Sequence, residues 1–165
     1  MLLLLGLTCA GCGYRVGGQA NLLPKDIHTI AVPAWGNITT QYKLPVYMAE
    51  AVSRELNSRT RYTVIADPTK ADATLYASIA NMFSNATVFD ATTGRGTGAQ
   101  IIVQIQVRLV AKDGKVLFTR PNLEFRDRYE ISLNPGQYLD ESQATLQRLS
   151  RDVARTVVSA ILENF

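Results

Sequence analysis

The sequence contains one histidine and two cysteines, and it has no run of like charges. A catalytic zinc site needs three ligands drawn mostly from His, Cys and acidic residues, and a Cys/His pair needs both residue types. The lone histidine, His28, is therefore expected to be structural. No G-x-S-x-G motif marks a nucleophile elbow. These shortages predict a protein that is not an enzyme, with no catalytic residue, no metal and no cofactor.

Long hydrophobic runs are also absent. The chain opens MLLLLGLTCAGCG, in which nine residues from Leu2 to Ala10 precede a polar sequence. About 20 apolar residues are needed to cross a bilayer, so this stretch predicts the hydrophobic region of a signal peptide. No Lys or Arg precedes it. Since such signals begin with basic residues, we expect the true start to lie upstream.

The hydrophobic stretch ends in Cys9-Ala10-Gly11-Cys12, whose last three positions match the cleavage motif of bacterial lipoproteins. Cys12 is the predicted lipid-bearing residue, because Thr8 is too bulky to precede a cleaved cysteine. The alternative is a disulfide or a CxxC redox pair, but those motifs lie at the mouth of a βαβ unit, and no strand precedes this one. An acylated cysteine anchors a protein to the membrane. Gly13 stands where Asp would favour the inner membrane, which indicates the outer membrane.

The remaining composition is that of a globular protein. Apolar residues make up 47% of the chain and charged residues 19%. The net charge of +3 comes from 17 basic and 14 acidic residues that are dispersed along the chain, so no nucleic-acid partner is expected. We predict a signal peptide over residues 1–11, a lipid anchor and tether over residues 12–20, and a single domain over residues 21–165.

Two amphipathic helices are predicted. Over residues 44–59 apolar side chains recur at every fourth position, and Pro45 suits a first helical turn. Near the C-terminus, Asp140 and Gln143 resemble a capping box that would open the second helix. Its buried stripe is expected to comprise Leu146, Leu149, Val153, Val157, Ala160 and Ile161.

Strands account for most of the rest. Short β-rich segments at 26–33 and 61–66 flank the first helix, and side chains alternate after Asp72. Asp113-Gly114 predicts a hairpin turn, with a return strand over residues 115–131 that is interrupted at Pro121. This order predicts an α+β fold, in which two helices pack on one face of a small mixed, mostly antiparallel sheet.

The clearest alternation lies between residues 100 and 109. Apolar side chains occupy the odd positions, while Gln104, Gln106 and Arg108 occupy even ones. In the strand after Asp72, Tyr76 and Ser78 likewise face away from the apolar set. The pattern predicts a sheet with one face in the core and one face that is wet or in contact with a partner.

Other polar clusters have simpler explanations. The glycine-rich segment Thr93–Gly98 leads into a strand rather than a helix N-terminus, so it predicts a hairpin tip and not a phosphate loop. Arg95 at that tip is a candidate contact for an anionic headgroup. Asp127 lies among arginines, which favours cross-strand salt bridges, and Asp152 is within helical reach of Arg148. Trp35 either caps the core or marks a binding surface.

The order of these motifs resembles the lipopolysaccharide-assembly lipoprotein family, LptE. The matching features are Gly11-Cys12-Gly13-Tyr14, an I-A-V-P strand, a helix from Leu44, an A-T-L-Y strand, Thr87-Val88-Phe89 before a loop, the alternating strand, and Asn134-Pro135 before the last helix. They cover nearly all of the chain after the signal. Members can carry a basic residue directly after the Val-Phe pair; this chain has Asp90 there, and Arg95 is the nearest substitute.

The resemblance implies a non-enzymatic lipoprotein on the periplasmic side of the outer membrane. It implies that the chain plugs the β-barrel LptD, assists its assembly, and so enables lipopolysaccharide to enter the outer leaflet. The polar side chains of Gln104, Gln106 and Arg108 would then face the barrel lumen, and Arg95 would be placed to contact lipopolysaccharide. The alternative is a periplasmic lipoprotein that regulates another envelope machine, as a peptidoglycan-synthase activator or a secretion accessory.

Overall fold

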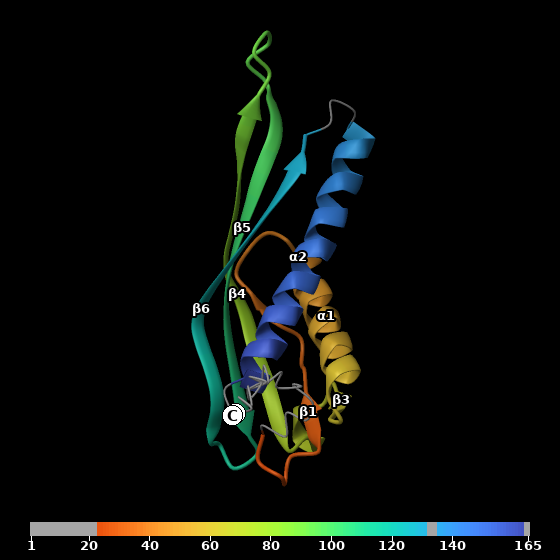
Figure 1. The fold of residues 1–165 in the computed structure, drawn as a ribbon, viewed down its shortest axis with the longest axis vertical. Coiled ribbons are helices and arrows are strands. Elements are labelled where there is room, and N and C mark those ends of the chain that lie inside the picture. The colour runs from red at the N-terminus through yellow and green to blue at the C-terminus, as the bar shows by residue number, and fades with distance from the viewer. Residues whose placement is uncertain (1–22, 132–134, 164–165) are drawn as a thin grey trace, which may run out of the picture.

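The computed structural model describes residues 23–131 and 135–163. Two helices and a six-stranded mixed sheet form an elongated α+β domain (Figure 1). The elements are β1 (Thr29–Ala31), β2 (Gly36–Asn37), α1 (Leu44–Arg59), β3 (Thr63–Ile65), the short 3-10 helix η1 (Pro68–Lys70), β4 (Ala73–Phe89), β5 (Gly96–Ala111), β6 (Val116–Glu130) and α2 (Pro135–Glu163). The predicted fold class is confirmed.

The strands lie in the order β3-β1-β4-β5-β6, and β2 pairs with β4 outside this path. Pairing is parallel between β1 and β3, between β1 and β4, and between β2 and β4. The long pairs β4–β5 and β5–β6 are antiparallel. Strands β4 and β5 continue past the other strands as a projecting hairpin (Figure 1).

Both helices cover the same face of the sheet (Figure 1). The apolar stripe of α1 is buried, and so are Leu149, Val153, Val157 and Ile161 of α2. They pack with the odd-numbered apolar residues of β5 in one core. Trp35 also belongs to this core, with only 5% of its surface exposed. The opposite face of β4, β5 and β6 is covered by no described element.

Three details differ from the sequence prediction. Helix α2 begins at Pro135, so Asp140 lies inside the helix rather than at its cap; proline is favoured at a first helical position. Strand β6 continues through Pro121, where the register with β5 shifts and β6 carries one extra residue. Proline is tolerated there because β6 is an edge strand with a bulge. The two-residue strand β2 was not predicted.

Among the described residues, no helix combines the length and the apolar character that a transmembrane span requires.

Candidate functional site

The uncovered face of the sheet carries a polar surface. In the register of β4 and β5, Tyr76 lies beside Arg108 and Ser78 beside Gln106. In the register of β5 and β6, Gln104 lies beside Glu124. Paired residues project on the same side of a sheet, so these side chains share one face. We call this surface, formed by Tyr76, Ser78, Gln104, Gln106, Arg108, Thr119, Glu124 and Arg126, the open face.

The middle of the open face is held by a local hydrogen-bond network. The Gln104 amide Nε2 donates to Glu124 Oε2 at 3.1 Å, and Arg126 Nε donates to Glu124 Oε1 at 2.8 Å. The hydrogen bond from Gln104, followed by that from Arg126, lowers the pKa of Glu124 from its ordinary value. Glu124 therefore stays ionised, and it neutralises Arg126 within the sheet.

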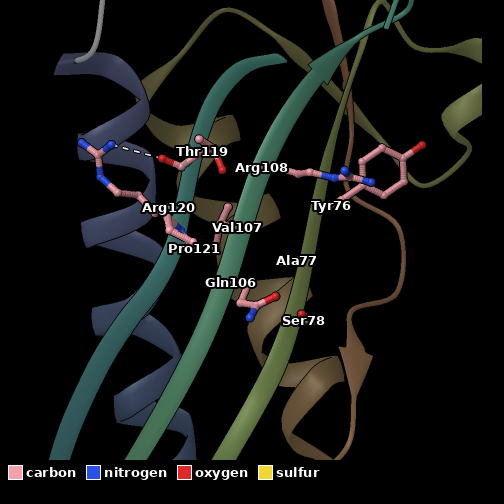
Figure 2. A pocket seen from close by; sticks show the side chains of 9 residues that line it. All are labelled: Tyr76, Ala77, Ser78, Gln106, Val107, Arg108, Thr119, Arg120 and Pro121. Carbon is pink, nitrogen blue, oxygen red and sulfur yellow. Dashed lines mark hydrogen bonds between the residues drawn. The ribbon is translucent and has the colours of Figure 1, made fainter. Parts of the chain in front are cut away.

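A hollow of about 360 Å³ lies at one end of the open face, beside the β6 bulge (Figure 2). On one side, the Arg108 guanidinium lies over the Tyr76 ring, 5.4 Å from its centroid. The hollow is lined by Tyr76, Ala77, Ser78, Gln106, Val107, Arg108, Thr119, Arg120 and Pro121.

The two arginines of this hollow do not converge. Figure 2 shows the Arg120 side chain directed to the side opposite Arg108. Its guanidinium donates a hydrogen bond to the Thr119 carbonyl at 3.1 Å and lies 4.9 Å from the centroid of the buried Phe118 ring. Arg108 is therefore the only guanidinium of the lining that faces the Tyr76 side of the hollow.

The hairpin tip is a separate site. Asp90 Oδ1 accepts hydrogen bonds from the backbone N–H groups of Thr92 and Thr93 and from the Thr93 hydroxyl. Gly94 adopts a positive φ of 67°, which closes the turn. Arg95 is exposed, and Val88 and Phe89 at the end of β4 are 56% and 59% exposed. The tip thus combines one cation with apolar side chains.

A groove of about 490 Å³ separates the hairpin from α2, between Val88, Ala99 and Tyr129 on one side and Arg148 on the other. Arg148 does not pair with Asp152, as the sequence suggested. It lies 3.5 Å from Asp127 Oδ2 and donates to the Arg128 carbonyl and the Thr145 hydroxyl. The cross-strand ion pair predicted for Asp127 is therefore wrong, because its partner comes from the helix.

Asp152 pairs with Arg155 at 3.6 Å, one turn later in α2. The lone histidine makes local contacts: His28 Nδ1 lies 3.1 Å from the Asp26 carbonyl oxygen. No group of three potential metal ligands occurs in the described ranges 23–131 and 135–163.

The structure brings together three of the predicted contact residues and separates the fourth. Gln104, Gln106 and Arg108 share the open face, whereas Arg95 lies at the tip, roughly 30 Å from Gln104 along β5 at the usual rise per residue. Cys12 lies outside the described residues. The sequence analysis did not identify Tyr76 as the partner of Arg108, although it placed Tyr76 on the outward side of its strand.

Residues 27–161 match the model of a family described as LptE, lipopolysaccharide-assembly. This finding confirms the family resemblance seen in the motifs. No curated protein matches the chain.

Solved structures share the fold. Lipoprotein B from Nitrosomonas europaea aligns with a TM-score of 0.56 at 14% identity, over 92% of this chain and 96% of that one. The rare lipoprotein B from Shewanella oneidensis gives a TM-score of 0.54 at 12% identity, with 82% and 94% covered. The PelC dodecamer from Paraburkholderia phytofirmans gives 0.54 at 13%, with 82% and 89% covered. At these identities the likeness concerns the fold alone.

Proposed function

The chain belongs to the LptE lipopolysaccharide-assembly family, and from this premise we propose that it is a lipoprotein that plugs an LptD-like outer-membrane β-barrel and assists its assembly. In this role it enables lipopolysaccharide to enter the outer leaflet. It acts by occupying and shaping the barrel, not by catalysis. The observation that carries the proposal is the family match, which spans almost the whole described domain.

The open face supports this role. A sheet surface that alternates polar and charged side chains would be costly to bury against an apolar partner, because each unpaired polar group loses its hydration. The lumen of a β-barrel is instead polar. Gln104 and Arg126 are held in place by Glu124, so the surface is already ordered before a partner binds.

The elongated shape also supports insertion into a barrel. The β4–β5 hairpin projects beyond the helices at one end of the long axis (Figure 1). Its tip carries Arg95, which we propose as a contact for the phosphate groups of passing lipopolysaccharide, since a guanidinium binds phosphate through paired N–H groups. The exposed Val88 and Phe89 beside it suit the apolar part of a glycolipid.

We propose that Cys12 bears the lipid and holds the protein on the periplasmic side of the outer membrane. The support is the Ala10-Gly11-Cys12 motif after a leucine-rich run and the Gly13 that follows it. The membrane contact is then covalent lipid rather than a spanning helix.

Depletion in the source bacterium tests the function. Cells that lose the chain should stop delivering lipopolysaccharide to the surface, measured by surface labelling with an antibody to lipopolysaccharide, and a plasmid copy should restore delivery. Affinity purification of the tagged chain should recover an outer-membrane β-barrel. If depletion left surface lipopolysaccharide unchanged and the chain instead recovered a peptidoglycan synthase or a secretion channel, the regulatory alternative would replace this proposal.

A further inference from the structure

We propose that the hollow beside Tyr76 and Arg108 receives the carboxylate of an aspartate or glutamate on the luminal wall of the partner barrel. The inference rests on the proposed function and specifies one contact within it. It concerns the chemistry of a single site on the open face.

The first argument is charge. The hollow is lined by two arginines and no acidic residue. Arg126, elsewhere on the open face, is neutralised by Glu124 at 2.6 Å. Arg108 forms no ion pair with any carboxylate in the described part of the chain, so its charge is available to a partner.

The second argument is orientation. Stacking on the Tyr76 ring fixes the plane of the Arg108 guanidinium, and the N–H groups at its edge remain free to donate. A guanidinium that is held in place loses less conformational entropy when it binds a carboxylate through two parallel hydrogen bonds. The Ser78 hydroxyl and the Gln106 amide lie on the neighbouring register pair and can supply further hydrogen bonds.

The third argument concerns the choice of anion. A phosphate group carries about −1.5 to −2 charges and is bound by clusters of cations. Arg120, the other arginine of the lining, points away from Arg108 (Figure 2) and bonds to its own strand. One converging cation matches the single charge of a carboxylate. The hollow is also large enough, at about 360 Å³, to admit a protein side chain.

The test compares Arg108→Glu with Arg120→Glu in the full-length, tagged chain co-expressed with its barrel. Arg108→Glu places two like charges in contact and should lower the ratio of barrel to chain in the purified complex about 10-fold or more. Arg120→Glu changes the same net charge at the rim of the same hollow, and it should leave the ratio within about twofold. Arg108→Gln, which removes the charge without reversing it, should give an intermediate ratio.

A photoreactive amino acid at position 106 then identifies the neighbour. We expect a cross-link to the barrel polypeptide close to an Asp or Glu, and replacement of that acid by Lys should restore complex formation to Arg108→Glu. If the wild-type chain recovers the barrel and Arg108→Glu recovers it equally well, the site is wrong while the plug function stands. A cross-link to lipopolysaccharide would overturn the carboxylate assignment. If the wild-type chain recovers no barrel, the proposed function fails as well.

Discussion

At the scale of single residues, two aspartates act as hydrogen-bond acceptors that fix the backbone. Asp90 organises the hairpin tip, where the backbone N–H of Thr93 is the largest cause of its lowered pKa, followed by the Thr93 hydroxyl. The position after the Val-Phe pair is thus committed to closing a turn. A cation for a ligand must come from elsewhere in the loop, and Arg95 is the residue that the turn exposes.

Arg95→Glu tests whether the tip contacts glycolipid. The exchange should weaken binding of purified lipopolysaccharide about 10-fold or more, since a charge-assisted hydrogen bond of about 1.5–3 kcal/mol is replaced by repulsion. The melting temperature should be unchanged because the side chain is exposed and its backbone contacts remain. Lys112→Glu, an exposed site at the other end of β5, is the control. Wild-type affinity in Arg95→Glu would exclude Arg95 as a ligand.

Asp72 joins the start of β1 to the start of β4. Its Oδ2 accepts hydrogen bonds from the backbone N–H groups of His28 and Thr29, at 2.9 and 2.8 Å, and from the Thr29 hydroxyl at 2.8 Å. The bond from the His28 N–H is the largest cause of its lowered pKa, followed by the Thr29 hydroxyl. Because the folded protein binds a proton at Asp72 less readily than the unfolded chain, the carboxylate stabilises the fold above the ordinary pKa of about 3.9.

Asp72→Asn should therefore lower the free energy of unfolding at pH 7 by about 1–3 kcal/mol, the usual cost of lost bonds to a charged acceptor. This difference from wild type should shrink as the pH falls through the lowered pKa of Asp72, where the wild-type carboxyl also becomes neutral. Urea unfolding at pH 7 and at pH 3 measures it. Asp26→Asn, an exposed aspartate in the preceding segment, is the control. A difference that is constant with pH would contradict the mechanism.

At the scale of elements, the sequence predicted the parts with regular periodicity. The bounds of α1 were correct, because a four-residue apolar repeat and Pro45 mark one face and one end. The alternation in β5 correctly predicted which side chains of the sheet remain outside the core. The start of α2 was wrong, because Asp140 and Gln143 resemble a cap by residue type, while Pro135 allows the helix to begin earlier.

The candidate site was harder to predict, because it depends on register and docking. The pairing of Tyr76 with Arg108 follows from bulges in β4 and near the hairpin tip, which shift the register by amounts that no local pattern specifies. The contact between Asp127 and Arg148 requires the position of α2 against β6. Alternation identified the face, but only the tertiary arrangement identified the partners.

The helix face of α2 provides a test at this scale. Val153 is fully buried in the core between α2, α1 and β5. Val153→Asp would place an unpaired carboxylate there, which costs several kcal/mol and should lower the melting temperature by more than about 10 °C or prevent folding. Arg151→Asp, which adds a carboxylate on the exposed side of the same helix, should change the melting temperature by only a few degrees. Equal melting temperatures for wild type and Val153→Asp would contradict the assignment of this face.

At the scale of the whole molecule, the two ends of the long axis have different contents. The described chain enters near β1, where Leu23 and Ile27 are already buried in the core, and the hairpin tip lies at the opposite end (Figure 1). The proposed lipid-bearing Cys12 is 11 residues before Leu23. Fully extended, that length reaches at most about 40 Å. An anchor at Cys12 therefore keeps the β1 end near the membrane surface and leaves the tip free to extend into a partner.

This arrangement makes the anchor separable from the fold, and Cys12→Ser tests it. The substitution should abolish incorporation of labelled fatty acid and block removal of the signal, because a serine hydroxyl cannot replace the thiol in lipid transfer. The described core lies wholly after Leu23, so the melting temperature of the purified domain should not change. Cys9→Ser is the matched control and should be labelled and processed like wild type. Labelling of Cys12→Ser at the wild-type level would refute the lipidation site, and loss of labelling in Cys9→Ser alone would move it to Cys9.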